Sequence, residues 1–108
     1  MAITINLRYK GQNGSAVQFA EEMITGGTVD KIRAEKGNLR YEYYQQLDDK
    51  ETILLIDSWE SQEALDLHHA SPIMAKIAAL REKYDLHMKV EQYVSTDTPE
   101  SENKFIRE

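Results

Sequence analysis

The folds that this chain can adopt are limited most strongly by one short run, Ile53-Leu54-Leu55-Ile56, which is apolar on both faces of a strand. A strand of this kind is usually central in its sheet and is covered on both faces. The polar residues Asp48-Asp49-Lys50 precede it, and the alternating segment 39–44 before them predicts a partner strand in a hairpin. Helices can cover one face of the resulting sheet. We expect a second copy of the chain to cover the other.

The remaining segments supply more strands and the helices. Alternation of apolar and polar side chains predicts strands over residues 3–9 and 86–91. Apolar side chains at helical spacing predict a helix over about 15–25 with Ser15 as its N-cap, and, after a break at Gly26-Gly27, a second segment from Thr28 that Gly37 ends. A further helical stretch over 61–84 has a new helix start at Ser71-Pro72. The order is β-α-β-β-α-β. It predicts an α+β protein of the ferredoxin-like type, a four-stranded antiparallel sheet with helices on one face.

Length, charge and composition favour a single small domain. The 108 residues can form one core, which we assign to residues 1–95, and we expect the polar residues 96–108 to form a mobile C-terminal tail. The net charge of −6, with scattered basic residues, argues against nucleic acid as a partner. The apolar runs are far too short to span a membrane. Because the chain has no cysteine and no signal-like N-terminus, we expect a cytoplasmic protein without a metal site.

Several short motifs lie in and around the hairpin, at Arg33-Ala34-Glu35-Lys36-Gly37, Leu39-Arg40-Tyr41-Glu42, Trp59-Glu60-Ser61-Gln62-Glu63-Ala64-Leu65, His68 and Ser71-Pro72. Together with the element order, they resemble the antibiotic biosynthesis monooxygenase (ABM) domain family, which includes quinol monooxygenase-like proteins. The similarity covers about residues 2–95. It implies a dimeric α+β barrel with one pocket per subunit between the sheet and the helices.

The resemblance also implies a range of activities. Enzymes of the family oxygenate aromatic substrates such as quinols and polyketide anthrones with O₂, without metal or flavin. Other members of the superfamily degrade haem, isomerise or cleave small molecules, or have no established activity. The haem-degrading branch relies on a strand Asn, a helix Trp and a downstream His. Only Asn6 matches these positions, since His68 and Ala78 occupy the other two, which argues against haem degradation.

His68 is the first candidate for a catalytic residue. Its register with Ala64 and Leu65 directs it inward, and a pocket imidazole can accept a substrate hydroxyl proton near neutral pH. In oxygenation without a cofactor, the resulting anion can pass one electron to O₂. The alternative is a structural histidine that binds a carbonyl or a dimer partner. We expect His69 to face solvent and His87 to lie at the surface or an interface.

Asn6 and Arg8 are candidates on the first strand, on the face opposite to Ile5 and Leu7. The amide of Asn6 could orient a substrate oxygen or stabilise an oxyanion, and Arg8 could bind the substrate beside it. The alternative for both is a polar strand residue at the solvent or at a dimer interface.

Aromatic residues of the hairpin are candidates for shaping the pocket. Trp59, at the end of the central strand, is more typical of a core or pocket wall than of chemistry. Tyr41 and Tyr43 share one face of their strand, so they either line the pocket with their hydroxyls or stack at a dimer interface. Asp57 is an alternative general base, unless its carboxylate pairs with Arg8 or Arg40.

The sequence therefore predicts a homodimeric, cofactor-independent monooxygenase that oxidises a small quinol or phenol with O₂. His68 would handle the proton and Asn6 would position the oxygen. The substrate would contact Trp59, Tyr41, Tyr43 and Arg8.

Two alternatives remain open. A small-metabolite isomerase or lyase would need cationic anchors, such as Arg8, Arg33 or Arg40, that converge in the pocket. A non-catalytic ligand-binding or stress-response domain would be indicated by a cavity too small for an aromatic ring.

Overall fold

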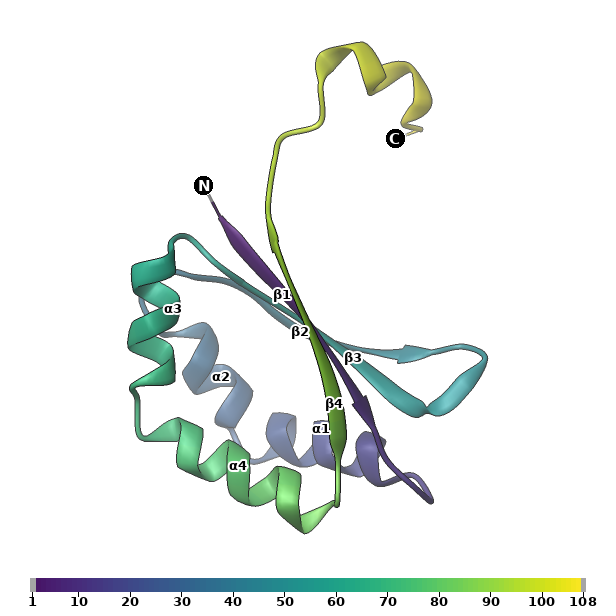
Figure 1. The fold of residues 1–108 in the computed structure, drawn as a ribbon, viewed down its shortest axis with the longest axis vertical. Helices are drawn as coiled ribbons and strands as arrows, with labels where there is room; N and C mark the ends of the chain where they lie inside the picture. Colours follow the sequence, from purple (N-terminus) through teal and green to yellow (C-terminus); the bar gives the residue numbers. More distant parts are fainter. Residues whose placement is uncertain (1, 108) are drawn as a thin grey trace.

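The computed structural model describes residues 2–107, so the first residue of the predicted domain and the last of the predicted tail lie outside the described part of the chain. Its elements follow the predicted order (Figure 1). They are β1 (Ile3–Lys10), α1 (Ser15–Thr25), α2 (Thr28–Arg33), β2 (Asn38–Gln46), β3 (Asp49–Trp59), α3 (Gln62–His69), α4 (Ile73–Lys83), β4 (His87–Val94) and the 3₁₀ helix η1 (Glu100–Phe105).

The four strands form one antiparallel sheet in the order β2-β3-β1-β4. The two-sided apolar strand β3 is central, as predicted, with β2 on one side and β1 on the other. Figure 1 shows α1, α2, α3 and α4 all on the same face of this sheet. This arrangement confirms the predicted ferredoxin-like α+β fold.

The hairpin between β2 and β3 is tighter and less regular than the sequence suggests. Its turn lies at residues 47–48, because Gln46 already pairs with Asp49, whereas the polar residues predicted a turn at 48–50. At the other end of β2 the register shifts between Asn38 and Arg40. A bulge of this kind takes a residue out of alternation. For this reason Leu39 is 58% exposed, although alternation along the strand predicts that it points inward together with Tyr41.

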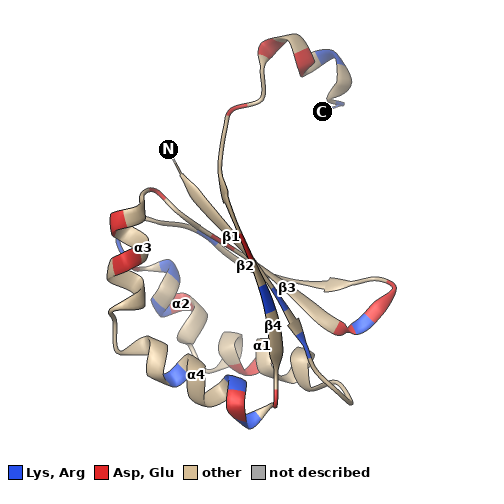
Figure 2. Ribbon diagram, in the orientation of Figure 1, with Lys and Arg blue, Asp and Glu red and all other residues tan. Residues whose placement is uncertain are grey.

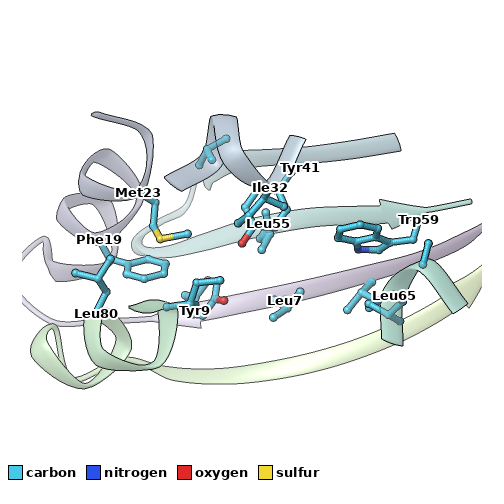
Figure 3. Close-up of a cluster of buried hydrophobic side chains, with 14 residues drawn as sticks. Leu7, Tyr9, Phe19, Met23, Ile32, Tyr41, Leu55, Trp59, Leu65 and Leu80 are labelled. Carbon is cyan, nitrogen blue, oxygen red and sulfur yellow. The ribbon is translucent and has the colours of Figure 1, made fainter. Parts of the chain in front are cut away.

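The helix-facing side of the sheet carries the hydrophobic core (Figure 3). Odd-numbered residues of β1, such as Leu7 and Tyr9, meet Phe19 and Met23 of α1, and the Tyr9 and Phe19 ring centroids are 5.1 Å apart. Burying a large apolar side chain of this kind contributes about 1.5–3 kcal/mol. Packing on this face therefore fixes which side of each strand points inward.

The helix layer is delimited by local signals. The Ser61 hydroxyl accepts a hydrogen bond from the backbone N–H of Ala64 at 3.1 Å and caps α3. Gly37 has a φ of +87° after α2, which fits its predicted role as a stop. Ser15 is not the predicted cap but the first residue of α1, because Gly14 takes the capping position and the Ser15 hydroxyl accepts instead from the N–H of Gln12.

The opposite face of the sheet, called the outer face below, has no helix over it (Figure 1). Two half-buried apolar residues, Leu54 and Ile56, lie in its middle beside the polar Asn6, Arg8 and Glu42 of the neighbouring strands. Tyr44 and Tyr93 on the edge strands are 43% and 49% exposed. The helix layer on the other side carries interspersed acidic and basic residues (Figure 2). No helix within residues 2–107 has the length and apolar character to cross a membrane.

The segment after β4 runs away from the body of the molecule and ends in η1 (Figure 1). Phe105 of this 3₁₀ helix is 78% exposed, and Ile106 beyond it is 49% exposed. The predicted tail therefore contains a turn of helix that packs little against its own domain, and its mobility stays a prediction.

Candidate functional site

A cavity of about 200 Å³ lies between the inward face of the sheet and the helices α3 and α4. Much of its wall is apolar and comes from β1, β3, β4 and α4. The polar side chains that line it are Tyr41, Asp57, His68, His69, Arg81 and Gln92. An apolar cavity with a few polar groups is typical of a small-molecule site.

His68 is held in the last turn of α3 with 3% of its surface exposed. Its Nδ1 lies 2.9 and 3.1 Å from the two carboxylate oxygens of Glu35, which belongs to the connection between α2 and β2. With Nδ1–H donating to this carboxylate, the lone pair of the neutral ring is on Nε2. That nitrogen has no hydrogen-bond partner among the described residues. Burial lowers the pKa of His68 and Glu35 acts against this, and the lowered pKa favours the neutral ring, which can accept a proton.

Trp59 supports His68 from the side of the core. The two rings are stacked with centroids 4.7 Å apart and an interplanar angle of 28°. Trp59 is fully buried near Leu65, as Figure 3 shows, and it does not line the cavity. The structure thus places the predicted pocket-wall residue one layer behind the wall, where it restricts the orientation of the imidazole.

Asp57 occupies the middle of the sheet beneath the helices, opposite Ile5 of β1 and Tyr41 of β2. It is 5% exposed, and its Oδ1 has no hydrogen-bond partner among residues 2–107. The pKa of Asp57 is raised to about 7, and burial is the largest cause. The negative charge of Glu35 also raises this pKa, whereas the Trp59 indole N–H and the positive charge of Arg81 lower it. The predicted alternative, a pair with Arg8 or Arg40, is wrong, because these arginines pair with other carboxylates on the outer face.

Arg81 enters the cavity from α4, and the sequence reasoning missed it. Its Nη2 donates a hydrogen bond of 2.8 Å to the Tyr9 hydroxyl, and its guanidinium carbon lies 5.4 Å from the Tyr9 ring centroid. The buried Nε has no partner within the described part of the chain. The available signal was its position four residues after Ile77, which extends the inward stripe of that helix.

Of the two predicted tyrosines, Tyr41 lines the cavity and Tyr43 packs beside it. Tyr41 is 2% exposed, and its ring meets Tyr43 edge-on with centroids 5.8 Å apart. Tyr43 also packs edge-on against Phe19 at 6.2 Å. Both face the helix layer and not the outer face, so the alternative of stacking at an interface between sheets is wrong.

Asn6 and Arg8 are not brought together with His68. Asn6 pairs with Ile56 of β3 and Glu91 of β4, and its side chain belongs to the outer face. Arg8 lies on the same side and forms an exposed ion pair with Glu91. Alternation separates these two residues from Ile5 and Leu7 correctly, but the cavity lies on the side of the apolar residues.

The arginines invoked for an isomerase or lyase do not converge either. Arg33 donates from Nε and Nη2 to the Tyr41 carbonyl at 3.0 and 2.7 Å, and Arg40 pairs with Glu42. Arg8 lines a different, open hollow of about 430 Å³ to which all four strands contribute, with Gln46 from β2 and Thr52 from β3. The ion pairs of Arg8 with Glu91 and of Arg40 with Glu42 are exposed, and pairs of this kind contribute little to stability.

A metal centre is not formed by the described residues, because no three His, Cys, Asp or Glu side chains in residues 2–107 gather closely enough to hold an ion.

The family model "Antibiotic biosynthesis monooxygenase" matches residues 2–80 of the chain. The chain belongs to the antibiotic biosynthesis monooxygenase family. This confirms the resemblance found in the sequence motifs, and the matched region includes Glu35, Asp57 and His68. No curated protein sequence matches this family member.

Solved structures confirm the fold. A conserved protein from Methanosarcina mazei Go1 superimposes with a TM-score of 0.75 at 20% identity, covering 89% of this chain and 94% of that one. PA3566 from Pseudomonas aeruginosa gives 0.74 at 23% identity, with 89% and 95% covered. SnoaB from Streptomyces nogalater, described as a cofactor-independent oxygenase, gives 0.74 at 15% identity, with 90% and 95% covered. At these identities the likeness shows a shared fold.

Proposed function

We propose that this family member is a cofactor-independent monooxygenase that oxidises a small quinol or phenolic substrate with O₂. The observation that carries the proposal is the Glu35–His68 pair, which presents a neutral imidazole to a largely apolar cavity. The family match supports an oxygenase, and SnoaB shows that the fold accommodates one without a cofactor.

The size of the cavity fits one aromatic ring. A dry apolar cavity of about 150 Å³ accepts benzene. The cavity here measures about 200 Å³, which leaves room for a ring with small substituents. This volume is evidence against the alternative in which the pocket is too small for any ring.

His68 would perform the proton transfer. Its Nε2 accepts the proton of a ring hydroxyl, the O–H electron pair remains on the substrate, and Glu35 stabilises the imidazolium that forms. The electron-rich anion then passes one electron to O₂, and the two radicals combine at carbon to give a hydroperoxide. Loss of water from this hydroperoxide leaves one oxygen atom on the ring, so that quinol and O₂ give a hydroxyquinone and water.

A homodimer and a cytoplasmic location complete the proposal. Leu54 and Ile56 in the middle of the outer face, with no helix over them, support a partner sheet there. In such a dimer Asn6 and Arg8 would lie at or near the subunit interface and would not contact substrate in this cavity.

The proposal predicts that metal-free protein accelerates O₂ uptake with at least one member of a panel of single-ring quinols. His68→Ala should lower kcat about 10²- to 10⁴-fold, because a general base is lost. His87→Ala is the matched control, since that histidine is largely exposed on β4 and lies outside the cavity. An oxygen electrode measures both.

Two results would count against it. Absence of O₂ uptake with every quinol would rule out the monooxygenase. Undiminished activity of His68→Ala would remove only the assignment of the base. Glu35→Gln should give an intermediate loss, because the ring keeps a hydrogen-bond partner but loses the charge that stabilises its protonated form.

A further inference from the structure

The edge strand β4 carries apolar side chains on the helix-facing side of the sheet that the helices leave partly uncovered. Met88 and Val90 pair with Tyr9 and Leu7 of β1, so they point to the same side as these two core residues. Tyr9 and Leu7 are 0% and 8% exposed, whereas Met88 and Val90 are 44% and 54% exposed. The helix layer therefore covers β1 fully and β4 only in part.

The cavity described above opens to solvent at this strand. Met88, Val90 and Gln92 all line the cavity, although each of them is exposed. The exposed polar residues of the wall lie toward α3. His69 is the last residue of that helix, and the Gln92 side-chain amide donates a hydrogen bond of 3.5 Å to the side-chain oxygen of Gln62. The apolar part of the opening thus lies over Met88 and Val90.

The charged residues of the same strand face away from this opening. Lys89 and Glu91 alternate with Met88 and Val90, and they therefore belong to the outer face. Met74, near the start of α4, lines the cavity from the helix side. Methionine side chains are flexible and adapt to apolar ligands of varied shape. An apolar group that crosses the opening would gain contacts, whereas a charged group there would lose hydration without gaining a partner.

The opening is continuous with the space that suits one ring. The cavity measures about 200 Å³, so a substrate longer than a single ring has to extend through the opening. The segment after β4 runs away from the body of the molecule (Figure 1), and the proposed dimer uses the outer face. This arrangement favours a second part of the same ligand as the group that covers Met88 and Val90.

We infer that the substrate is a phenolic ring with an apolar chain, and that the chain leaves the cavity over Met88 and Val90. The ring then lies inside the cavity with its hydroxyl at His68, and the chain packs on the helix-facing side of β4. The inference deepens the proposed function and rests on it for the phenolic ring. In this arrangement Met88 and Val90 determine specificity and take no part in the proton transfer.

The test is a binding measurement without O₂, so that no turnover is needed. Isothermal titration compares phenol with 4-ethylphenol and 4-butylphenol, and with 4-(2-hydroxyethyl)phenol as a polar analogue. A fully buried methylene raises affinity about fourfold, and a chain on an open strand is buried on one side only, so each carbon should contribute about twofold. Wild-type protein should therefore bind 4-butylphenol about tenfold more tightly than phenol, and the polar analogue more weakly than 4-ethylphenol.

Two valines of β4 give a matched pair of variants. Val90→Asp should bring the affinity ratio of 4-butylphenol to phenol down to about one, because the chain would desolvate the new carboxylate. Val94→Asp is the control. Val94 pairs with Ile3 on the same side of the sheet and is 52% exposed, but it does not line the cavity, so the tenfold preference should remain. If Val90→Asp does not fold, Val90→Thr, which keeps the branched shape and removes apolar surface, should still lower the ratio.

Failure of the inference and failure of the oxygenase give different results. Equal wild-type affinities for phenol and 4-butylphenol, or an unchanged ratio in the folded Val90 variant, would overturn the inference. A chain preference that appears only in Phe105→Ser would also overturn it, because the exposed Phe105 of a tail would then occupy the opening. No affinity for any of the four phenols would overturn the inference together with the phenolic substrate. A protein that prefers 4-butylphenol through Val90 but consumes no O₂ with any quinol would support the inference and refute the monooxygenase.

Discussion

A buried carboxyl group without an ion-pair partner makes stability depend on pH, and Asp57 is such a group. Its pKa is raised from 3.8 to about 7, chiefly by burial. Between these values the folded protein keeps a proton that the unfolded chain releases, so stability falls as the pH rises through this window. Ionising a carboxyl group with such a shift costs the folded state roughly 4 kcal/mol.

Asp57→Asn should therefore be more stable than the wild type at pH 8, by roughly 1–4 kcal/mol, and should lose this advantage near pH 4. Urea unfolding at pH 4, 6 and 8 measures the difference. Asp49→Asn is a control of opposite sign. The hydrogen bond from Lys10 lowers the pKa of Asp49, so its contribution is present at neutral pH and is lost only as the pH falls through the folded value below 3.8. Parallel curves for Asp57→Asn and the wild type would contradict the assignment.

At the level of the elements, the turn between α2 and β2 holds the site together. Gly37 in this turn accepts a hydrogen bond from the N–H of Glu60 at 2.8 Å, just before α3 begins. A Cβ on Gly37 would lie 2.6 Å from the Cβ of Ala64 in α3. Close approach at this glycine thus lets Glu35, two residues earlier, reach His68 on the neighbouring helix.

Gly37→Ala should destabilise the protein by about 2–4 kcal/mol, because it combines an unfavourable φ with a steric clash. Gly27→Ala separates the two causes. Gly27 has a φ of +81° but nothing within 4 Å of its added Cβ, so this variant should lose only about 1–2 kcal/mol. Thermal or urea unfolding measures both. Equal losses would mean that the contact with α3 is not tight.

The order and type of the elements could be predicted because they follow local periodicity, and α1 even has the expected bounds of residues 15–25. The bulge at Leu39 and the turn at 47–48 could not, since both depend on pairing with β3.

The site was predicted only in part for a related reason. His68 lies on a helix whose inward side is unambiguous, but alternation in β1 does not reveal which face meets a cavity. Arg81 joins Asp57 only through packing of α4 on the sheet.

For the whole molecule, the outer face is the surface through which the proposed dimer would form. Ile56 lies in the middle of this face and is only half-buried within the single chain. Association of two such faces would bury the side chains that the helix layer does not reach.

Ile56→Glu should convert a dimeric wild type into a monomer at micromolar concentration, because the dimer would have to bury a charge between two sheets. Leu47→Glu is the matched control: Leu47 is 97% exposed at the hairpin turn, and the variant should stay dimeric. Light scattering after size-exclusion chromatography measures the mass. A monomeric wild type would refute the dimer without affecting the fold.

The stacking of Trp59 on His68 also has a spectroscopic consequence. The chain has a single tryptophan, so all indole fluorescence comes from a ring whose centroid lies 4.7 Å from that of the imidazole. A protonated imidazole quenches an excited indole by accepting an electron, and a neutral imidazole does so far less. The emission of the unlabelled protein therefore reports the charge of His68. Transfer of a proton from a bound phenol to His68 would lower the intensity of this emission as it occurs.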